Sequence, residues 1–211
     1  MKNWLKKQGV QFHYQTNLIK LETHNGKITK AETNSTNFVA DEYVLAAGIF
    51  SKELVKNLGV DLPLISGKGY SIDFFDTHLN LNTPVILSEA RVALTPFANS
   101  LRLGSGMEFN GNTGKVSMQR VQAMLDRTHE ALPGFSKVQA RKLKIWEGLR
   151  PVTPDGVPLI GRTKQIKNLL VATGHAMMGV SLSPVTGKII SDLVIGKSDG
   201  LFSDIYRLNR F

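Results

Sequence analysis

The stretch LLVATGHAMMGVSLSP, residues 169–184, decides the fold class. Its apolar start predicts a buried strand, which ends at Gly174. A loop bracketed by Gly174 and Gly179 follows. Ser183 and the proline after it are residue types that begin helices, so a helix is expected at about 184–195. A strand that passes through a glycine loop into a helix is typical of mixed α/β proteins.

A similar pattern occurs in ADEYVLAAGIFS, residues 40–51. It predicts a second buried strand, which ends in the small residues Ala46, Ala47 and Gly48. Ser51 is placed to cap a helix that runs to about residue 58. The small residues leave room for a ligand or a crossing backbone, and close packing within a sheet accounts for them equally well.

The rest of the chain contains more predicted strands than helices. A helix at 2–8 and a strand at 10–14 come first, and Asn25-Gly26 predicts a hairpin between strands 18–23 and 28–33. A strand at 37–40 completes a small antiparallel meander. Further along we expect one helix at 115–132 and strands at 64–74, 85–87, 91–95, 101–106 and 142–147. The fold class is therefore α/β with a mostly antiparallel part.

Composition excludes several classes of function. The 211 residues include no cysteine, and the five histidines lack metal-ligand spacing, so neither a disulfide nor a metal site is expected. The net charge of +9 comes from scattered Lys and Arg without a nucleic-acid-binding motif, and no nucleic-acid partner is expected. No apolar run reaches the ~20 residues that span a bilayer. We expect a cytoplasmic protein, either free or peripheral to the inner face of the membrane.

Two segments carry candidate binding chemistry. In WEGLRPVTPDGVPLIG, residues 146–161, Pro151 favours an extended Arg150, whose guanidinium is suited to gripping a carboxylate. A surface arginine in a proline-rich loop is the alternative. In the 174–179 loop, glycines allow a flat ring to approach, and a helix start stabilises negative charge. The alternative is an ordinary strand–loop–helix connection.

Five segments, in their order along the chain, resemble motifs of the D-amino-acid oxidase superfamily. The likeness is greatest to the D-amino-acid dehydrogenases, and glycine oxidase and sarcosine oxidase are relatives. The segments are ADEYVLAAGIFS, LPLISGKGYSIDF, LRLGSGMEFNG, WEGLRPVTPDGVPLIG and NLLVATGHAMMGVSLSPVTGKIISDLV. Together they extend over essentially the whole chain, and the last two are the most specific.

The resemblance implies FAD as cofactor and a small amino acid as substrate. By that likeness Arg150 holds the substrate carboxylate and Tyr70 faces the substrate. The cofactor-binding positions it implies are Leu18, Ala46, Ala47, Gly48, Gly174, His175, Ala176, Met177, Met178, Gly179, Val180 and Ser181. Hydride passes from the amino-acid α-carbon to the flavin, and the imine hydrolyses to a 2-oxo acid and ammonia. This chemistry depends on orientation, so no catalytic base is nominated, and His175 is expected to pack or orient the backbone.

The sequence departs from the family pattern in the segment that binds the FAD pyrophosphate. The resemblance assigns an FAD-binding domain to residues 1–64 and 150–211, and a substrate domain to residues 65–149. The Gly-x-Gly-x-x-Gly segment that binds the FAD pyrophosphate in the family has no match in this sequence. The resemblance therefore implies the C-terminal part of such an enzyme, with weak FAD binding alone. Exposed apolar edges would favour an N-terminal half chain or a second copy as partner. A non-catalytic fragment is the alternative. The amino acid and the electron acceptor, oxygen or a quinone, stay open.

Overall fold

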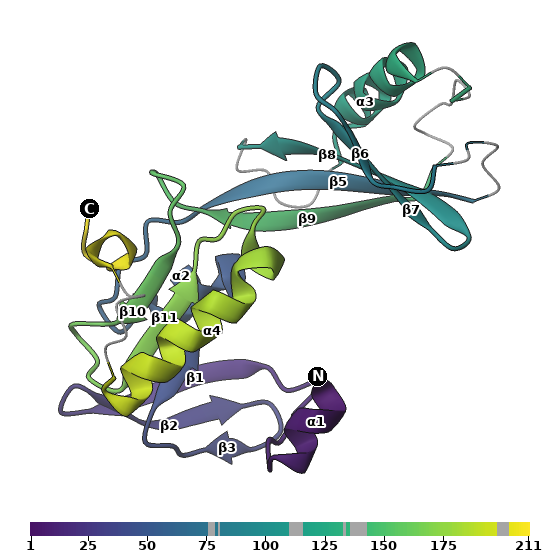
Figure 1. Ribbon diagram of the computed structural model, residues 1–211. Coiled ribbons are helices and arrows are strands. Elements are labelled where there is room, and N and C mark those ends of the chain that lie inside the picture. The colour runs from purple at the N-terminus through teal and green to yellow at the C-terminus, as the bar shows by residue number, and fades with distance from the viewer. Residues whose placement is uncertain (76–78, 80, 110–115, 133, 136–142, 198–202) are drawn as a thin grey trace. The chain divides into compact units, whose positions relative to one another are not determined.

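The computed structural model describes residues 1–75, 79, 81–109, 116–132, 134–135, 143–197 and 203–211 (Figure 1). These residues form two compact units. Unit 1 comprises Met1–Leu62, Leu159–Thr173 and Leu182–Phe211, and unit 2 comprises Pro63–Pro158 and Gly174–Ser181. Helices and strands are mixed in the chain, which confirms the predicted α/β class.

Unit 1 begins with the short helix α1 (Lys2–Lys7) and an antiparallel meander. The meander consists of β1 (Leu18–His24), β2 (Lys27–Thr33) and β3 (Asn37–Phe38). Asn25 and Gly26 join β1 to β2 with positive φ angles of 50° and 72°, as the Asn-Gly signal predicted. The prediction of a strand at 10–14 was wrong, because the structure has no strand there. Val10 and Tyr14 are exposed there, so the segment has no buried face that would hold it in a sheet.

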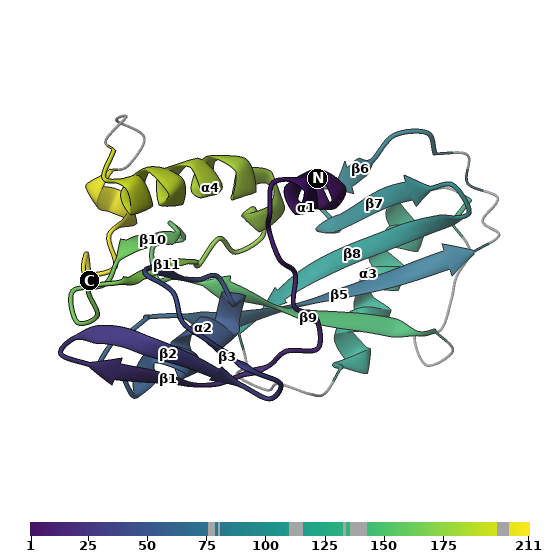
Figure 2. The same ribbon diagram turned by 90° about the horizontal axis from the view of Figure 1, so that it is seen from below.

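The second sheet of unit 1 has the order β10-β11-β4. β10 (Leu159–Arg162) pairs antiparallel with β11 (Leu169–Thr173), and β11 pairs parallel with β4 (Tyr43–Leu45). Helix α4 (Gly179–Ile195) runs alongside β10 and β11 (Figures 1 and 2). The 3-10 turn η1 (Gly48–Phe50) and helix α2 (Ser51–Lys56) follow β4, and the 3-10 turn η3 (Asp204–Tyr206) lies near the C-terminus.

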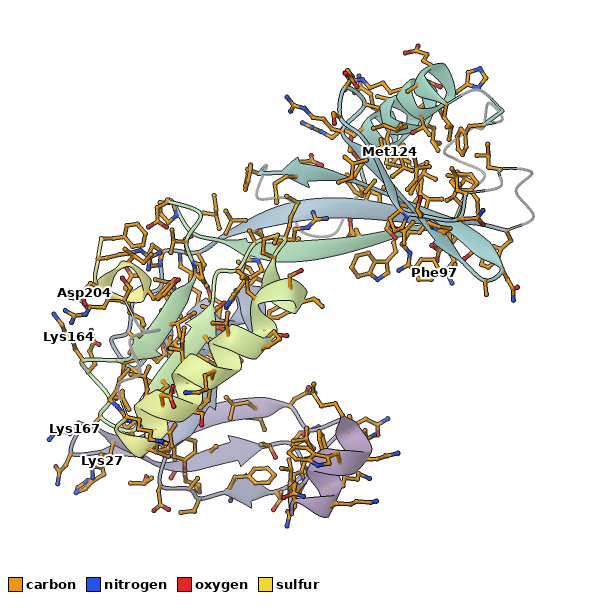
Figure 3. The ribbon with its side chains drawn as sticks, in the orientation of Figure 1. Lys27, Phe97, Met124, Lys164, Lys167 and Asp204 are labelled. Atoms are coloured by element: carbon orange, nitrogen blue, oxygen red, sulfur yellow. The ribbon has the colours of Figure 1, made fainter. Side chains whose placement is uncertain are left out.

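A buried side chain joins the two sheets of unit 1. Asn168, just before β11, accepts from the Ile28 N–H at 2.8 Å and donates to the Ile28 carbonyl at 2.9 Å. Both residues are buried. The Lys167 N–H also donates to the Gly26 carbonyl at 2.8 Å, and Lys27 and Lys167 lie at this end of the unit (Figure 3). The hairpin is therefore anchored to the second sheet in part through the buried N–H and C=O of Ile28, which have the Asn168 side chain as their partner.

Unit 2 is built on a five-stranded antiparallel sheet of order β6-β7-β8-β5-β9. The strands are β5 (Ile65–Phe75), β6 (Val85–Leu87), β7 (Val92–Phe97), β8 (Ser100–Glu108) and β9 (Ile145–Val152). Helix α3 (Met118–Ala131) covers one face, and Met124 lies between the helix and the sheet (Figure 3). The core there includes Ile72, Val92, Leu94, Leu103, Val121 and Leu125.

Unit 2 extends further than the boundary expected at residue 149. β9 stays paired with β5 as far as Val152, opposite Ile65, and this pairing keeps the Arg150-Pro151 segment in unit 2. The predicted strand at 142–147 begins at Ile145 in the structure, and residue 142 lies outside the described residues. Within the described ranges, no helix combines the length and the apolar character that a membrane span requires.

Candidate functional site

The predicted carboxylate-binding arginine lies on β9, in the middle of its pairing with β5. Gly67 is directly opposite Arg150, and Gly69 is opposite Gly148. Because side chains alternate along a strand, these four positions share one face of the sheet. Figure 2 shows β5 and β9 side by side. We call this surface the glycine face.

The glycines let long side chains lie flat against the sheet. A Cβ on Gly69 would meet Nη1 of Arg150 at 1.8 Å, and a Cβ on Gly148 would meet the Trp146 ring at 2.4 Å. A Cβ on Gly67 would meet Sδ of Met107 at 2.2 Å. Each clash is with a side chain, so the absence of a Cβ at these glycines leaves the room that Arg150, Trp146 and Met107 occupy. Of the residues on the glycine face, the sequence pattern predicted a role for Arg150 alone, because the pairing of the glycines depends on the register of β5 and β9.

The Arg150 guanidinium is held on one side and open on the other. Nη1 donates to the carbonyl oxygen of Gly106 at 2.9 Å. Among the described residues, no carboxylate forms an ion pair with it. Burial lowers the pKa of Arg150 from its ordinary value, although an arginine stays protonated at any physiological pH. A half-buried cation without an acidic partner favours an anion that presents two oxygens to the guanidinium fork.

The predicted 174–181 loop runs beside the end of β9, within the same unit as Arg150. Val152 and His175 form an antiparallel bridge, and the Ala176 N–H donates to the Pro151 carbonyl at 3.0 Å. The loop is therefore tied to the residue that follows Arg150. Gly174 has φ 82°, and Ala176 has the unusual φ 46° for a residue with a side chain, which makes the turn tight.

Apolar side chains of this loop are exposed. Met177 is 68% exposed, Met178 52% and Val180 90%. Burial lowers the pKa of His175, which favours the neutral imidazole. Exposed methionine and valine at the start of a 17-residue helix form an apolar surface beside the positive end of the helix dipole. This combination suits the edge of a flat, partly anionic ring.

The start of α4 differs from the sequence prediction. The helix begins at Gly179, five residues before the predicted first residue, and Pro184 lies inside it. Ser183 is therefore not the N-cap. Proline is best tolerated in the first turn, and here the turn before it has formed as well. As a result the helix start is moved onto the predicted loop residues Gly179, Val180 and Ser181.

The other predicted cofactor residues lie in unit 1. Leu18 opens β1, and Ala46, Ala47 and Gly48 connect β4 to α2. The Thr173 hydroxyl donates to the Gly48 carbonyl at 2.8 Å, which joins the ends of the two parallel strands β11 and β4. Gly48 has φ 58°, where a side chain is strained. Ligands of α/β sheets bind at the carboxyl ends of such strands.

Tyr70 lies on the opposite face of the β5–β9 pair from Arg150. It is 4% exposed, belongs to the core beneath α3 and donates its hydroxyl proton to Glu108 Oε2 at 2.6 Å. Burial, with this hydrogen bond, raises the pKa of Tyr70. The same face carries Lys68, whose Nζ lies 3.9 Å from Glu147 Oε2. The structure thus brings Arg150 together with the 174–181 loop but not with Tyr70, and this placement does not favour the predicted substrate contact.

These residues fit part of a flavin. The glycine face, the exposed loop and the helix start suit a flat ring and a carboxylate. A Cβ on Gly179 would lie 3.6 Å from His175 Cβ, which is an ordinary van der Waals contact. Gly-x-Gly-x-x-Gly, the seat for a pyrophosphate, does not occur in the sequence. Among the described residues, no group of His, Asp or Glu is arranged to hold a metal ion.

Comparison with known proteins places the chain in a family. Residues 1–193 match the family model described as FAD dependent oxidoreductase. The chain is 36% identical to the D-amino acid dehydrogenase of Neisseria meningitidis serogroup C / serotype 2a, over 98% of this chain and 49% of that protein. The D-amino acid dehydrogenase of Vibrio atlanticus is 33% identical over the same shares. The chain therefore spans about half the length of these curated relatives.

Solved structures show the same architecture. Glycine oxidase from Geobacillus kaustophilus superposes with a TM-score of 0.77 at 25% identity, over 93% of this chain and 52% of that one. L-proline dehydrogenase from P. horikoshii gives a TM-score of 0.83 at 20% identity, over 98% and 56%. The second likeness shows the fold alone.

Proposed function

Because the chain belongs to the family of FAD-dependent oxidoreductases, as its motifs indicated, we propose that it carries the substrate-binding and ring-side residues of an amino-acid dehydrogenase or oxidase. The substrate is a D-amino acid or a glycine-like amino acid. The α-carbon gives up a hydride to the two-electron acceptor and the amine nitrogen gives up a proton to solvent, which leaves an imine. Water then hydrolyses the imine to a 2-oxo acid and ammonia.

The observation that carries this proposal is the open guanidinium of Arg150. It lies flat on the glycine face, is fixed at Nη1 by the Gly106 carbonyl and forms no ion pair with an acidic side chain of the described residues. A substrate carboxylate supplies the missing charge. Two-point binding of that carboxylate fixes its plane and position and so limits how the α-carbon can lie. The protein contributes orientation, and we nominate no catalytic base.

FAD, when bound, supplies the two-electron acceptor for the hydride. We propose that the Gly174–Ser181 segment contacts its ring, with His175 orienting the backbone. In unit 1, Leu18 and the Ala46–Gly48 segment would meet the dinucleotide. On this view unit 1 corresponds to the incomplete FAD-binding domain and unit 2 to the substrate domain.

We further propose that the chain acts with a partner that supplies the pyrophosphate seat, either a half chain or a second copy. The outer strand β4 supports this. It ends the order β10-β11-β4, its Val44 is 48% exposed and the nearby Phe50 is 67% exposed. An edge strand with exposed apolar side chains is suited to pairing with another strand. We place the complex in the cytoplasm, in contact with the inner face of the membrane where a membrane quinone is the acceptor.

The test is FAD titration of the purified chain by calorimetry, first alone and then co-expressed with the half of the Neisseria relative that this chain does not match. We expect negligible heat alone. We expect a yellow complex that oxidises D-alanine with an artificial acceptor when the second half is present. Tight, stoichiometric FAD binding by the chain alone would contradict the need for a partner.

Arg150→Met in that complex separates binding from chemistry. It should keep the flavin spectrum and lose about 10²-fold in kcat/KM, because the substrate loses its orienting contact. Arg102→Met is the matched control, since Arg102 lies on the same sheet but is engaged by Asp73 at 2.7 and 2.8 Å. Equal activity of the Arg150 and Arg102 variants would overturn the role of Arg150.

A further inference from the structure

The hydrogen bond that fixes Arg150 comes from an irregularity in the neighbouring strand. Tyr70 pairs with Ser105 and Lys68 pairs with Glu108, so β8 carries one residue more than β5 between these pairs. The extra residue forms a β-bulge at Gly106 and Met107, and Gly106 has φ 89°. The bulge presents the Gly106 carbonyl to Arg150 and lays Met107 over Gly67.

The bulge is anchored from the other face of the sheet. Glu108, immediately after it, is 6% exposed and accepts the Tyr70 hydroxyl proton at 2.6 Å. Tyr70 Oη in turn accepts from the Ser117 N–H at 3.2 Å, and Arg120 Nε lies 3.4 Å from Glu108 Oε1. The Tyr70 ring also backs the bulge, because a Cβ on Gly106 would lie 3.4 Å from it.

We propose that Tyr70 and Glu108 are positioning residues that set the direction of the Arg150 guanidinium through the Gly106 bulge. Neither side chain touches the substrate. Tyr70 lies on the buried face of the sheet and holds the bulge in place. The Gly106 carbonyl of that bulge accepts from Arg150 on the glycine face. The inference deepens the proposed function, since it rests on Arg150 as the carboxylate-binding group.

A charge-assisted hydrogen bond between two buried groups is suited to this role. Such bonds are short and about twice as strong as neutral ones, so they tolerate little displacement of either partner. The Tyr70 ring and the Tyr70–Glu108 hydrogen bond tie the bulge to the buried face of the sheet, and removing the hydrogen bond loosens this anchor. The carbonyl would then sample several directions and release Nη1.

The test reads the Arg150 side chain directly, without FAD or substrate. In the full chain with ¹⁵N-labelled arginine, the Arg150 Nε–H resonance is assigned by its loss in Arg150→Lys. Tyr70→Phe, which keeps the ring and removes the hydroxyl, should shift this resonance by more than its linewidth. Glu108→Gln, which keeps the shape and removes the charge, should produce a smaller shift in the same direction.

Asp73→Asn is the control, because it breaks the Asp73–Arg102 pair between the same two strands, β5 and β8, away from the bulge. It should leave the Arg150 resonance in place. An unshifted resonance in folded Tyr70→Phe would overturn the proposal, and if that variant does not fold, an unshifted resonance in Glu108→Gln does so. Because no turnover is measured, this outcome is independent of whether the complex oxidises amino acids.

Discussion

Gly69→Ala offers a test of the glycine face that separates function from stability. The added Cβ would lie 1.8 Å from Arg150 Nη1, whereas ordinary contact begins at 3.4 Å, so the guanidinium must move by the difference, about 1.6 Å. The clash involves the far end of a flexible side chain, so the strand itself need not shift. The displacement takes Nη1 out of hydrogen-bond reach of the Gly106 carbonyl, now 2.9 Å away.

The expected change in the free energy of unfolding is small. A hydrogen bond from a charged donor contributes about 1.5–3 kcal/mol when buried, and less here because Arg150 is half-exposed. Replacing glycine by alanine on a compatible backbone gains about 0.4–1 kcal/mol by restricting the unfolded chain. The two effects oppose each other, and urea unfolding should therefore change by no more than about 1 kcal/mol.

The effect on substrate use should be much larger. A displacement of about 1 Å in an orienting group costs on the order of 10²-fold in rate, so kcat/KM for D-alanine in the FAD-containing complex should fall by about that factor. Gly104→Ala is the matched control, because a Cβ at Gly104 of β8 meets no atom within 4 Å. Wild-type kcat/KM in Gly69→Ala would refute the assignment of Arg150 to the substrate. A loss of several kcal/mol in stability would refute the inference that only the side chain moves.

Two further predictions concern the stability of the two units. Asn168→Ala should lower the free energy of unfolding by about 2–4 kcal/mol in urea, because the buried N–H and C=O of Ile28 lose their partner. Asn34→Ala, which removes two exposed hydrogen bonds at 2.8 and 3.2 Å, should cost under about 1 kcal/mol, and equal losses would contradict the role of burial. Burial lowers the pKa of His175, so the folded protein favours the neutral ring. The stability that this contributes is fully present above the unfolded-state pKa of 6.5 and is lost as pH falls below it. His175→Gln should flatten the decline of Tm below pH 6.5, and an unchanged slope would exclude that contribution.

Local sequence signals predicted the elements whose cause is local. Asn25-Gly26 favours positive φ at two successive residues, and the hairpin forms there. The apolar run from Leu169 to Thr173 is the buried centre of its sheet. By contrast, Val10–Tyr14 alternates like a strand but pairs with none of the described strands, and β10 was not predicted because its hydrogen-bond partner, β11, lies beyond an intervening loop. Pairing between distant segments is not encoded in any one window of sequence.

The position of Tyr70 shows which part of the site could be predicted from the sequence. Strand alternation alone places Tyr70 on the face of Lys68 and Ile72, away from Gly67 and Gly69, and that much is readable from LISGKGYSID. The register that sets Arg150 opposite Gly67 requires the fold, as does the bulge that aims the Gly106 carbonyl. One strand, β5, thus serves two faces. Its glycines accommodate Arg150, to which we assign the substrate carboxylate, and its tyrosine anchors the neighbouring strand from the core. A substitution at Tyr70 should therefore impair substrate binding from a position that the substrate does not touch.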